Sequence, residues 1–215
     1  DTNDPVDGQA YAYAYDNIGN RMSAARNSRT EEYTANNLNQ YTQRTIPAAA
    51  DIIGSAATNA TVTVNNQAVS RHGVYWYSLL SVTNSVTADY AQAIINAVYN
   101  PPGTNDPDIV STQTGHVFVA KTPEAFTYDD DGNLLSDGRF TYTWDAENRL
   151  VSAQTLTNLP ASVPRKKVEF AYDYMSRRVG KSAYAWSTNS ESWLLTSDSS
   201  FLYDGWNLLS ELSTV

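Results

Sequence analysis

The stretch YDDDGNLLSDGRFTYTWDAENRL, from Tyr128 to Leu150, contains two aromatic–Asp pairs sixteen residues apart. Each pair is followed by polar, turn-forming residues and then by leucine. When the whole chain is aligned on this pair, the stretch proves to be one part of an internal repeat. There are five clear copies, YAYDNIGNRMS from Tyr13, FTYDDDGNLLS from Phe126, FTYTWDAENRLVS from Phe140, FAYDYMSRRVG from Phe170 and FLYDGWNLLSE from Phe201, and one weaker copy, YTANNLNQYTQ from Tyr33.

Each copy predicts a β-hairpin. Tyr11, Tyr13 and Tyr15 alternate with alanine, which places the three rings on one face of a strand. Aromatic residues favour strands because they fit a pleated, half-buried surface. The Asp then begins a turn, because its carboxylate can accept from backbone N–H groups two residues on, and Gly19 and Gly132 tolerate positive φ. A second strand with aliphatic residues returns beside the first.

The copies resemble the tyrosine-aspartate (YD) repeats of the bacterial RHS proteins, which are relatives of the teneurins and of the shell-forming subunits of insecticidal toxin complexes. The resemblance covers about residues 10–44 and 126–215, more than half of the chain. It implies hairpins that join edge to edge into one long spiralling sheet, and it implies architecture rather than chemistry. The structural repeat motif comprises Tyr13, Tyr15, Asp16, Gly19, Asn20, Phe126, Tyr128, Asp129, Gly132, Asn133, Phe140, Tyr142, Trp144, Asp145, Asn148, Arg149, Phe170, Tyr172, Asp173, Phe201, Tyr203 and Asp204.

Residues 45–125 interrupt the repeats and are poor in charge. The segments 60–66, 73–82 and 115–121 have the alternation or β-rich composition of strands. Residues 88–100 fit a helical face as well as a strand face, and the context favours a strand. We therefore predict an all-β chain with a small immunoglobulin-like β-sandwich inserted between hairpins. The predicted domains are 1–44 (YD-repeat hairpins), 45–125 (inserted sandwich) and 126–215 (YD-repeat hairpins).

Composition excludes several classes of protein. The 215 residues are 41% hydrophobic, enough for one or two cores, and no apolar run is long enough for a membrane span. Cysteine is absent, which excludes disulfides and thiolate metal sites. The net charge of −9 would repel a phosphate backbone, and residues 165–167 form the longest basic cluster. Nucleic acid is not an expected partner, and no membrane span is expected.

No catalytic or metal-binding residues are predicted. Asp129–Asp131 suggests a calcium loop, but Gly138 then stands where that loop needs a bidentate Glu, so a turn is favoured. His72 and His116 lie too far apart in the sequence for metal-ligand spacing. No Gly-x-Ser-x-Gly elbow or nucleophile–base pair is present. The carboxylate pairs Asp198 with Asp204 and Glu191 with Glu211 are better explained as solvated surface residues. We therefore expect no enzyme activity and no cofactor.

The aromatic residues allow two interpretations. Exposed Tyr and Trp strips stack on sugar rings, so a carbohydrate-binding sheet is one possibility. Because the rings recur at the same motif position in every copy, an aromatic ladder that packs hairpin on hairpin explains them better. Trp76, Trp186 and Trp193 are outside the motif and are the candidates for ligand binding. Arg21, Arg149 and Arg177 follow the turns and are expected to form salt bridges with turn Asp residues.

The expected partners follow from the size of the sheet. Twelve strands span only about 58 Å at the usual strand spacing, too little to close a shell around a protein. The leading hypothesis is a non-catalytic structural segment of an exported bacterial RHS protein, extracellular or on the cell surface, that pairs with flanking YD repeats or other copies of itself. An adhesion module that binds cell-surface glycans and a fibre or tube subunit that assembles through β-edges are the alternatives. The family's autoproteolytic Asp-Pro-x-Gly pattern is absent, so neither self-cleavage nor toxicity is predicted.

Overall fold

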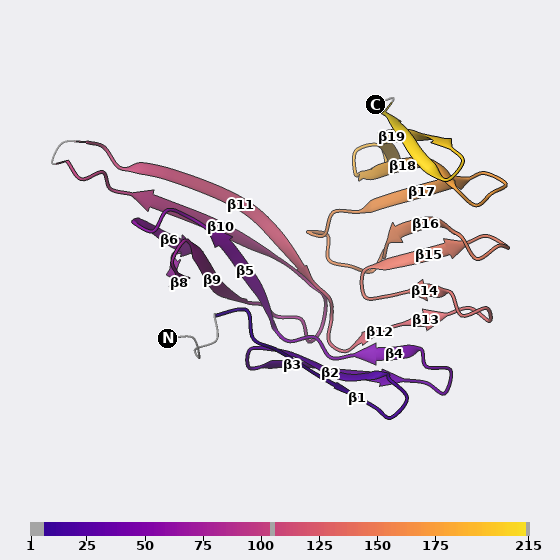
Figure 1. Cartoon of the computed structure of the whole chain (residues 1–215), viewed down its shortest axis with the longest axis horizontal. Coiled ribbons are helices and arrows are strands. Elements are labelled where there is room, and N and C mark those ends of the chain that lie inside the picture. Colours follow the sequence, from indigo (N-terminus) through magenta and orange to yellow (C-terminus); the bar gives the residue numbers. More distant parts are fainter. Residues whose placement is uncertain (1–6, 104–105, 214–215) are drawn as a thin grey trace. The chain divides into compact units, whose positions relative to one another are not determined.

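The computed structural model describes residues 7–103 and 106–213, and regular structure in these residues consists of β-strands alone (Figure 1). The all-β prediction is confirmed. The described residues contain no helix that could cross a membrane. The chain divides into two compact units, Asp1–Glu124 and Ala125–Val215. The strands are β1 (Tyr11–Tyr15), β2 (Arg21–Arg26), β3 (Arg29–Ala35), β4 (Tyr41–Arg44), β5 (Ala49–Ser55), β6 (Ala60–Val64), β7 (Gln67–Ala68), β8 (Ser70–His72), β9 (Tyr75–Ser81), β10 (Asp89–Tyr99), β11 (Ile109–Val119), β12 (Glu124–Ala125), β13 (Thr127–Tyr128), β14 (Leu134–Ser136), β15 (Phe140–Trp144), β16 (Leu150–Thr155), β17 (Lys166–Tyr172), β18 (Arg178–Ser187), β19 (Ser192–Asp204) and β20 (Asn207–Ser213).

The second unit is one antiparallel sheet of eight strands, β13 to β20, arranged in the order of the sequence. Four of the predicted hairpins form it, each joined to the next by a further reversal of the chain. The other two hairpins, β1–β2 and β3–β4, lie in the first unit, in a sheet of order β1-β2-β3-β4-β12. All six aligned copies are therefore hairpins.

Each hairpin carries a register shift one residue before the position of the motif Asp. In β15, for example, the shift falls between Thr143 and Trp144, so that Trp144 pairs with Leu150. Such a bulge bends the strand and increases its twist. The same shift occurs at Ala14/Tyr15, Thr34/Ala35, Thr127/Tyr128, Ala171/Tyr172 and Leu202/Tyr203.

The second unit has almost no enclosed interior. In β15 the rings of Phe140, Tyr142 and Trp144 are half-buried while Thr141 and Thr143 are exposed, as the period-two pattern predicts. Among the described residues of this unit, Val163 is the one apolar residue that is fully buried, at 2% exposure. The sheet must therefore be stabilised by contacts within its single layer.

Residues 49–119 form two further sheets, β5-β9-β8 and β11-β10-β6-β7. Their facing side chains make the core of the first unit: Val62, Val64, Trp76 and Ala93 are buried together. The ambiguous segment 88–100 forms strand β10, as the context favoured. The immunoglobulin-like character of this part, and the boundaries 44/45 and 125/126, stay predictions.

Asn84, which is 1% exposed, forms hydrogen bonds with both ends of this inserted segment. Its side-chain amide donates to the carbonyls of Ile46 (3.2 Å) and Ala120 (2.9 Å). The backbone N–H of Ile46 donates to Thr122 Oγ1 at 2.9 Å. The segment thus leaves the hairpin layer and returns to it at neighbouring points.

A packing test follows from Gly54, which pairs with Trp76 across β5 and β9. A Cβ at position 54 would lie 2.7 Å from Cε2 of the Trp76 ring, inside van der Waals contact. Gly54→Ala should therefore displace the ring and cost about 1–3 kcal/mol of unfolding free energy, measured by urea denaturation. Gly115→Ala is the matched control, since a Cβ there meets no atom within 4 Å. Equal losses in the two variants would contradict this account of the core.

Candidate functional site: the turn caps

The site is built from the turns, and the turn at Asp145 shows its geometry. One carboxylate oxygen of Asp145 accepts from the backbone N–H groups of Glu147 (2.9 Å) and Arg149 (3.0 Å). The backbone closes the turn as well, because Asp145 N–H donates to the Arg149 carbonyl at 3.0 Å. Asn148 takes a positive φ of 58°. The side chain thus satisfies backbone donors that the reversal leaves without partners.

Five turns share this plan, and we call their first residues the turn caps: Asp16, Asn36, Asp129, Asp145 and Asp173. Asn36 performs the task with its amide oxygen, which accepts from the N–H groups of Leu38 (2.9 Å) and Gln40 (3.0 Å). The third residue after each cap has positive φ, which explains the preference for Gly or Asn. These residues are Gly19, Asn39, Gly132, Asn148 and Ser176.

After four of the five caps, the fourth residue links one turn to the next. Arg149 donates from Nε to Asp145 Oδ2 at 2.7 Å and from a terminal nitrogen to the carbonyl of Asp173 at 3.2 Å. Arg177 likewise bonds Asp173 at 2.7 Å and the carbonyl of Gly205. Where this residue is Asn, its amide bridges the cap and the positive-φ Asn of the next turn: Asn20 to Asn39 (3.1 Å) and Asn133 to Asn148 (2.8 Å).

In three hairpins, the ring that precedes the motif Asp makes a second link to the preceding hairpin. The hydroxyl of Tyr172 donates to the carbonyl of Leu150 at 2.8 Å, and Tyr203 does the same to Arg178 at 2.9 Å. The indole N–H of Trp144 donates to the carbonyl of Leu134 at 2.8 Å. Each acceptor lies five residues after the cap of the preceding hairpin, where the register shift occurs. These bonds support the prediction that the rings form a ladder from hairpin to hairpin.

Hydrogen bonding holds the pKa of the turn carboxylates below its usual range. For Asp16 and Asp129 the main cause is the side-chain amide of Asn20 or Asn133. For Asp145 the main cause is the backbone N–H of Arg149. Burial alone would raise the pKa of Asp173, and the bonds from Arg177 outweigh it.

The predicted Arg–Asp salt bridges are confirmed at two of three positions. Arg149 pairs with Asp145 and Arg177 with Asp173, each at 2.7 Å. Arg21 instead lies against the rings of Tyr13 (5.3 Å) and Tyr33 (5.6 Å). The reason is its position: Asn20 occupies the fourth place after Asp16, so Arg21 stands one residue later.

The tryptophan candidates lie in different environments. Trp76 is 7% exposed in the core and offers no free ring face to a ligand. Trp186 and Trp193 pair edge to face, with ring centroids 5.3 Å apart. Lys167 lies over Trp193 at 5.7 Å from the ring centroid. The two ring planes lie at 74° to each other and so do not form one flat surface, and ligand binding there stays a prediction.

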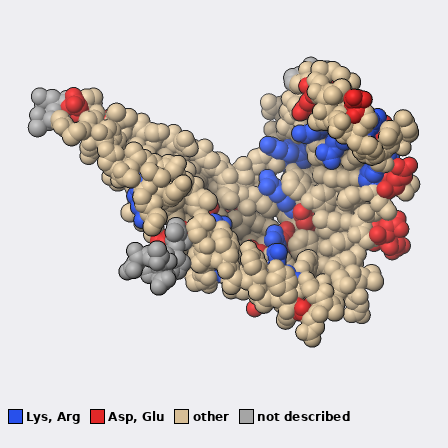
Figure 2. Space-filling model, viewed as in Figure 1, with Lys and Arg blue, Asp and Glu red and all other residues tan. Residues whose placement is uncertain are grey.

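Asp204 and His116, two other residues considered from the sequence, lie in a strand pair and in a ring stack. Asp204 ends β19 and pairs with Asn207, so the last hairpin turns through two residues, Gly205 and Trp206, instead of a capped turn. Tyr90 and His116 stack with ring centroids 4.7 Å apart. Among the described residues, no group of His, Cys, Asp or Glu could hold a metal ion. Acidic side chains gather at the edge of the second unit where its turns lie (Figure 2).

Sequence reasoning missed Asp51, whose side chain is 8% exposed. It pairs with Arg26 at 2.9 Å and with Arg29, and so connects the reversal between β2 and β3 to β5. Burial would raise the pKa of Asp51, but the Arg29 bond lowers it overall. No motif marks Asp51, because its partners lie more than twenty residues away in the chain.

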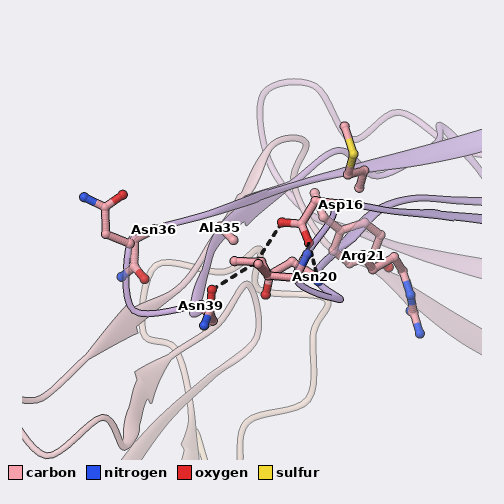
Figure 3. Close-up of a pocket in the computed structure, with 10 residues that line it drawn as sticks. Asp16, Asn20, Arg21, Ala35, Asn36 and Asn39 are labelled. Carbon is pink, nitrogen blue, oxygen red and sulfur yellow. Dashed lines mark hydrogen bonds between the residues drawn. The ribbon is translucent and has the colours of Figure 1, made fainter.

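A hollow of about 360 Å³ lies beside the first two turns (Figure 3). Asp16, Asn20 and Asn39 form its hydrogen-bonded side, and the short side chain of Ala35 lies next to them. Neither a nucleophile with a base nor a cluster of metal ligands lines it. The residues of the two turns that line the hollow fix the backbone geometry and leave an open space beside it.

Fold and site together define a protein of repeated, carboxylate-capped β-hairpins. In comparisons with known proteins, a part of the chain is similar to the tRNA nuclease WapA of Bacillus subtilis strain 168, with 38% identity over 66 residues. The tRNA3(Ser)-specific nuclease WapA of Bacillus spizizenii is 59% identical over 29 residues. The matches cover 31% and 14% of this chain but only 3% and 1% of those proteins. No family model matches the chain.

The pairing of caps with the fourth residue can be tested by swapping one turn for another. Asp16→Asn should lower the unfolding midpoint, because an amide N–H₂ would then face the N–H₂ of Asn20. Adding Asn20→Gln recreates the Asn36–Gln40 pair, in which the two amides bond at 2.8 Å, and should restore part of the loss. Thermal unfolding of the three proteins measures this. A double variant that is less stable than Asp16→Asn would contradict the pairing.

The depressed pKa values also predict how stability depends on pH. Unfolded Asp titrates near pH 3.9, and the folded caps titrate lower, so their contribution is present above about pH 4 and is lost as pH falls through the folded values. Urea unfolding at several values between about pH 2.5 and 6 should show stability falling with acidification. The variant with both Asp145→Asn and Asp173→Asn should show a shallower fall. An unchanged slope would mean that other groups control acid unfolding.

Proposed function

We propose that the chain is a non-catalytic structural segment of an exported bacterial protein of the RHS/YD-repeat kind, in which hairpins build a wall and residues 45–125 form an inserted domain. The observation that carries this proposal is the recurrence of one set of contacts, from cap to bridging residue to the next turn. A site for a small substrate does not need to be repeated along the chain. A wall of hairpins needs the same contact between each hairpin and the next.

Two further findings support the proposal. The net charge of −9 disfavours nucleic acid. The partial similarity to WapA favours an exported bacterial protein at the cell surface or outside the cell. The activity in the printed names of those nucleases is not carried over, because the chain spans about 3% or less of their length.

In this proposal the partners are flanking hairpins of the same kind. Strands β1 and β20 end their sheets and each has one neighbouring strand among the described residues. Both expose large apolar side chains: Tyr11, Tyr13 and Tyr15 are each about half exposed, and Leu209 is 67% exposed. A terminal strand of this kind is a template for a further strand.

The same edges support a second candidate, a subunit that assembles with copies of itself by strand addition at β20. Light scattering coupled to size exclusion, over a hundredfold range of concentration, separates the two. The leading proposal expects a constant mass of 23.7 kDa, and assembly expects mass to grow with concentration. Leu209→Lys is the matched variant, since a charge on β20 should prevent growth there while leaving a monomer unaffected.

Incubation of the purified chain with tRNA tests the non-catalytic part of the proposal. The RNA should remain intact in the presence or absence of divalent cations. Cleavage that persists in a second, independently purified preparation would overturn the assignment.

A further inference from the structure

The hollow in Figure 3 lies at the one hairpin that lacks an aromatic residue directly before its cap position. In the other five copies the residue before the motif Asp is Tyr or Trp, and in the second hairpin it is Ala35. The hollow is lined by Ala35 together with Asn20, Arg21 and Tyr33. The missing ring and the open space therefore coincide.

The intact repeats show what would fill such a space. The ring of Tyr172 lies 5.0 Å from the guanidinium of Arg149, the fourth residue after the preceding cap. Its hydroxyl donates to the carbonyl of Leu150, the fifth residue after that cap. The corresponding residues beside Ala35 are Asn20 and Arg21, and both line the hollow.

The neighbouring Tyr41 does not remove the space. It pairs with Ala35 in register, and its hydroxyl accepts from the N–H of Arg21 at 2.8 Å. Its ring packs on Tyr33, with centroids 5.2 Å apart. Tyr41 is not among the residues that line the hollow, and the hollow's volume of about 360 Å³ stays open beside Tyr33 and Ala35.

We propose that this hollow binds a 4-hydroxyphenyl group, with the ring between Ala35 and Met22 and the hydroxyl donating to the carbonyl of Arg21. Ile18 and Met22 supply apolar lining, and Asn20 and Asn39 supply the polar rim. The free phenol and the tyrosine side chain of another chain share this chemistry. The inference does not depend on the chain being a wall segment, because it rests on the geometry of one hairpin.

Titration of the ¹⁵N-labelled protein with 4-methylphenol tests the site, with amide chemical shifts as the readout. Saturable shifts should appear around residues 16–22 and 33–39, with a dissociation constant on the order of 1 mM, as expected for so small a ligand. Toluene, which has the ring without the hydroxyl, should bind more weakly. Absence of saturable shifts, or shifts centred elsewhere, would overturn the proposal.

Two substitutions make the test specific. Ala35→Tyr supplies the missing ring from within the chain and should abolish binding. Thr34→Tyr is the matched control, because it adds the same ring to the exposed side of β3 and should leave binding unchanged. Undiminished binding by a folded Ala35→Tyr would contradict the assignment.

A gain-of-binding variant keeps the test decisive if Ala35→Tyr does not fold. Tyr172→Ala opens the equivalent space beside Arg149 and Leu150 and should create a new site for 4-methylphenol in the second unit. A folded Tyr172→Ala protein without that site would refute the equivalence on which the proposal rests.

A second titration, with a tyrosine-containing peptide, shows whether the phenol comes from a free ligand or from another chain. If the acetylated tripeptide Gly-Tyr-Gly binds as tightly as 4-methylphenol, the hollow accepts a tyrosine of another chain. If only 4-methylphenol binds, it accepts a free phenol. Failure of both ligands to bind overturns the proposal. The test of the wall segment by light scattering is a separate measurement, so the two proposals can fail independently.

Discussion

The structure depends on one interaction, the bond from a turn carboxylate to the backbone N–H groups of the residues that follow it. The chain must reverse without leaving those donors unsatisfied, since an unpaired backbone group is costly wherever water is excluded. Asp145 satisfies two of them with one oxygen. Its second oxygen is then free to accept from Arg149. The cap therefore fixes the shape of the turn and the direction of the bridging side chain at once.

From this constraint the contact between hairpins follows. The register shift before each cap brings residues such as Trp144 and Leu150 into one pair. A carbonyl at that point has a second lone pair, and the Tyr172 hydroxyl of the next hairpin bonds to it. Arg149 reaches the backbone of the following turn at the same edge. Two links, one through a ring and one through the bridging residue, thus connect neighbouring hairpins independently of the strand ladder.

These links replace a core in the second unit. A sheet normally buries one face against another layer, and the first unit does so through Val62, Val64 and Trp76. The eight-stranded sheet instead encloses its rings only partly, side by side along its own surface. Cations add to this arrangement: Arg178 lies 4.1 Å from the centroid of the Phe170 ring, and Lys167 lies 4.4 Å from that of Tyr184. Contacts between side chains within one layer therefore take the place of a second layer in this unit.

Much of this could be predicted from sequence because the determining contacts are local. The aromatic–Asp pair, the alternation in residues 140–144 and the Arg at the fourth place all lie within one hairpin. Asp51 was missed because its partners Arg26 and Arg29 are distant in the chain. Sequence does not reveal that Trp76 packs with Val62 and Val64 in the core, so it cannot separate Trp76 from Trp186 and Trp193.

The last hairpin shows what happens when the local rule is broken. Asp204 has the preceding ring, Tyr203, but Gly205 follows at once with a φ of 56°. A glycine with positive φ at the first of two central positions suits a tight two-residue reversal, whose geometry matches the twist of paired strands. The turn is then too short to need a carboxylate cap, yet Tyr203 still donates to Arg178 and Arg177 still reaches Gly205. The links between hairpins therefore depend on the preceding cap and on the ring, and the final turn only has to supply a carbonyl.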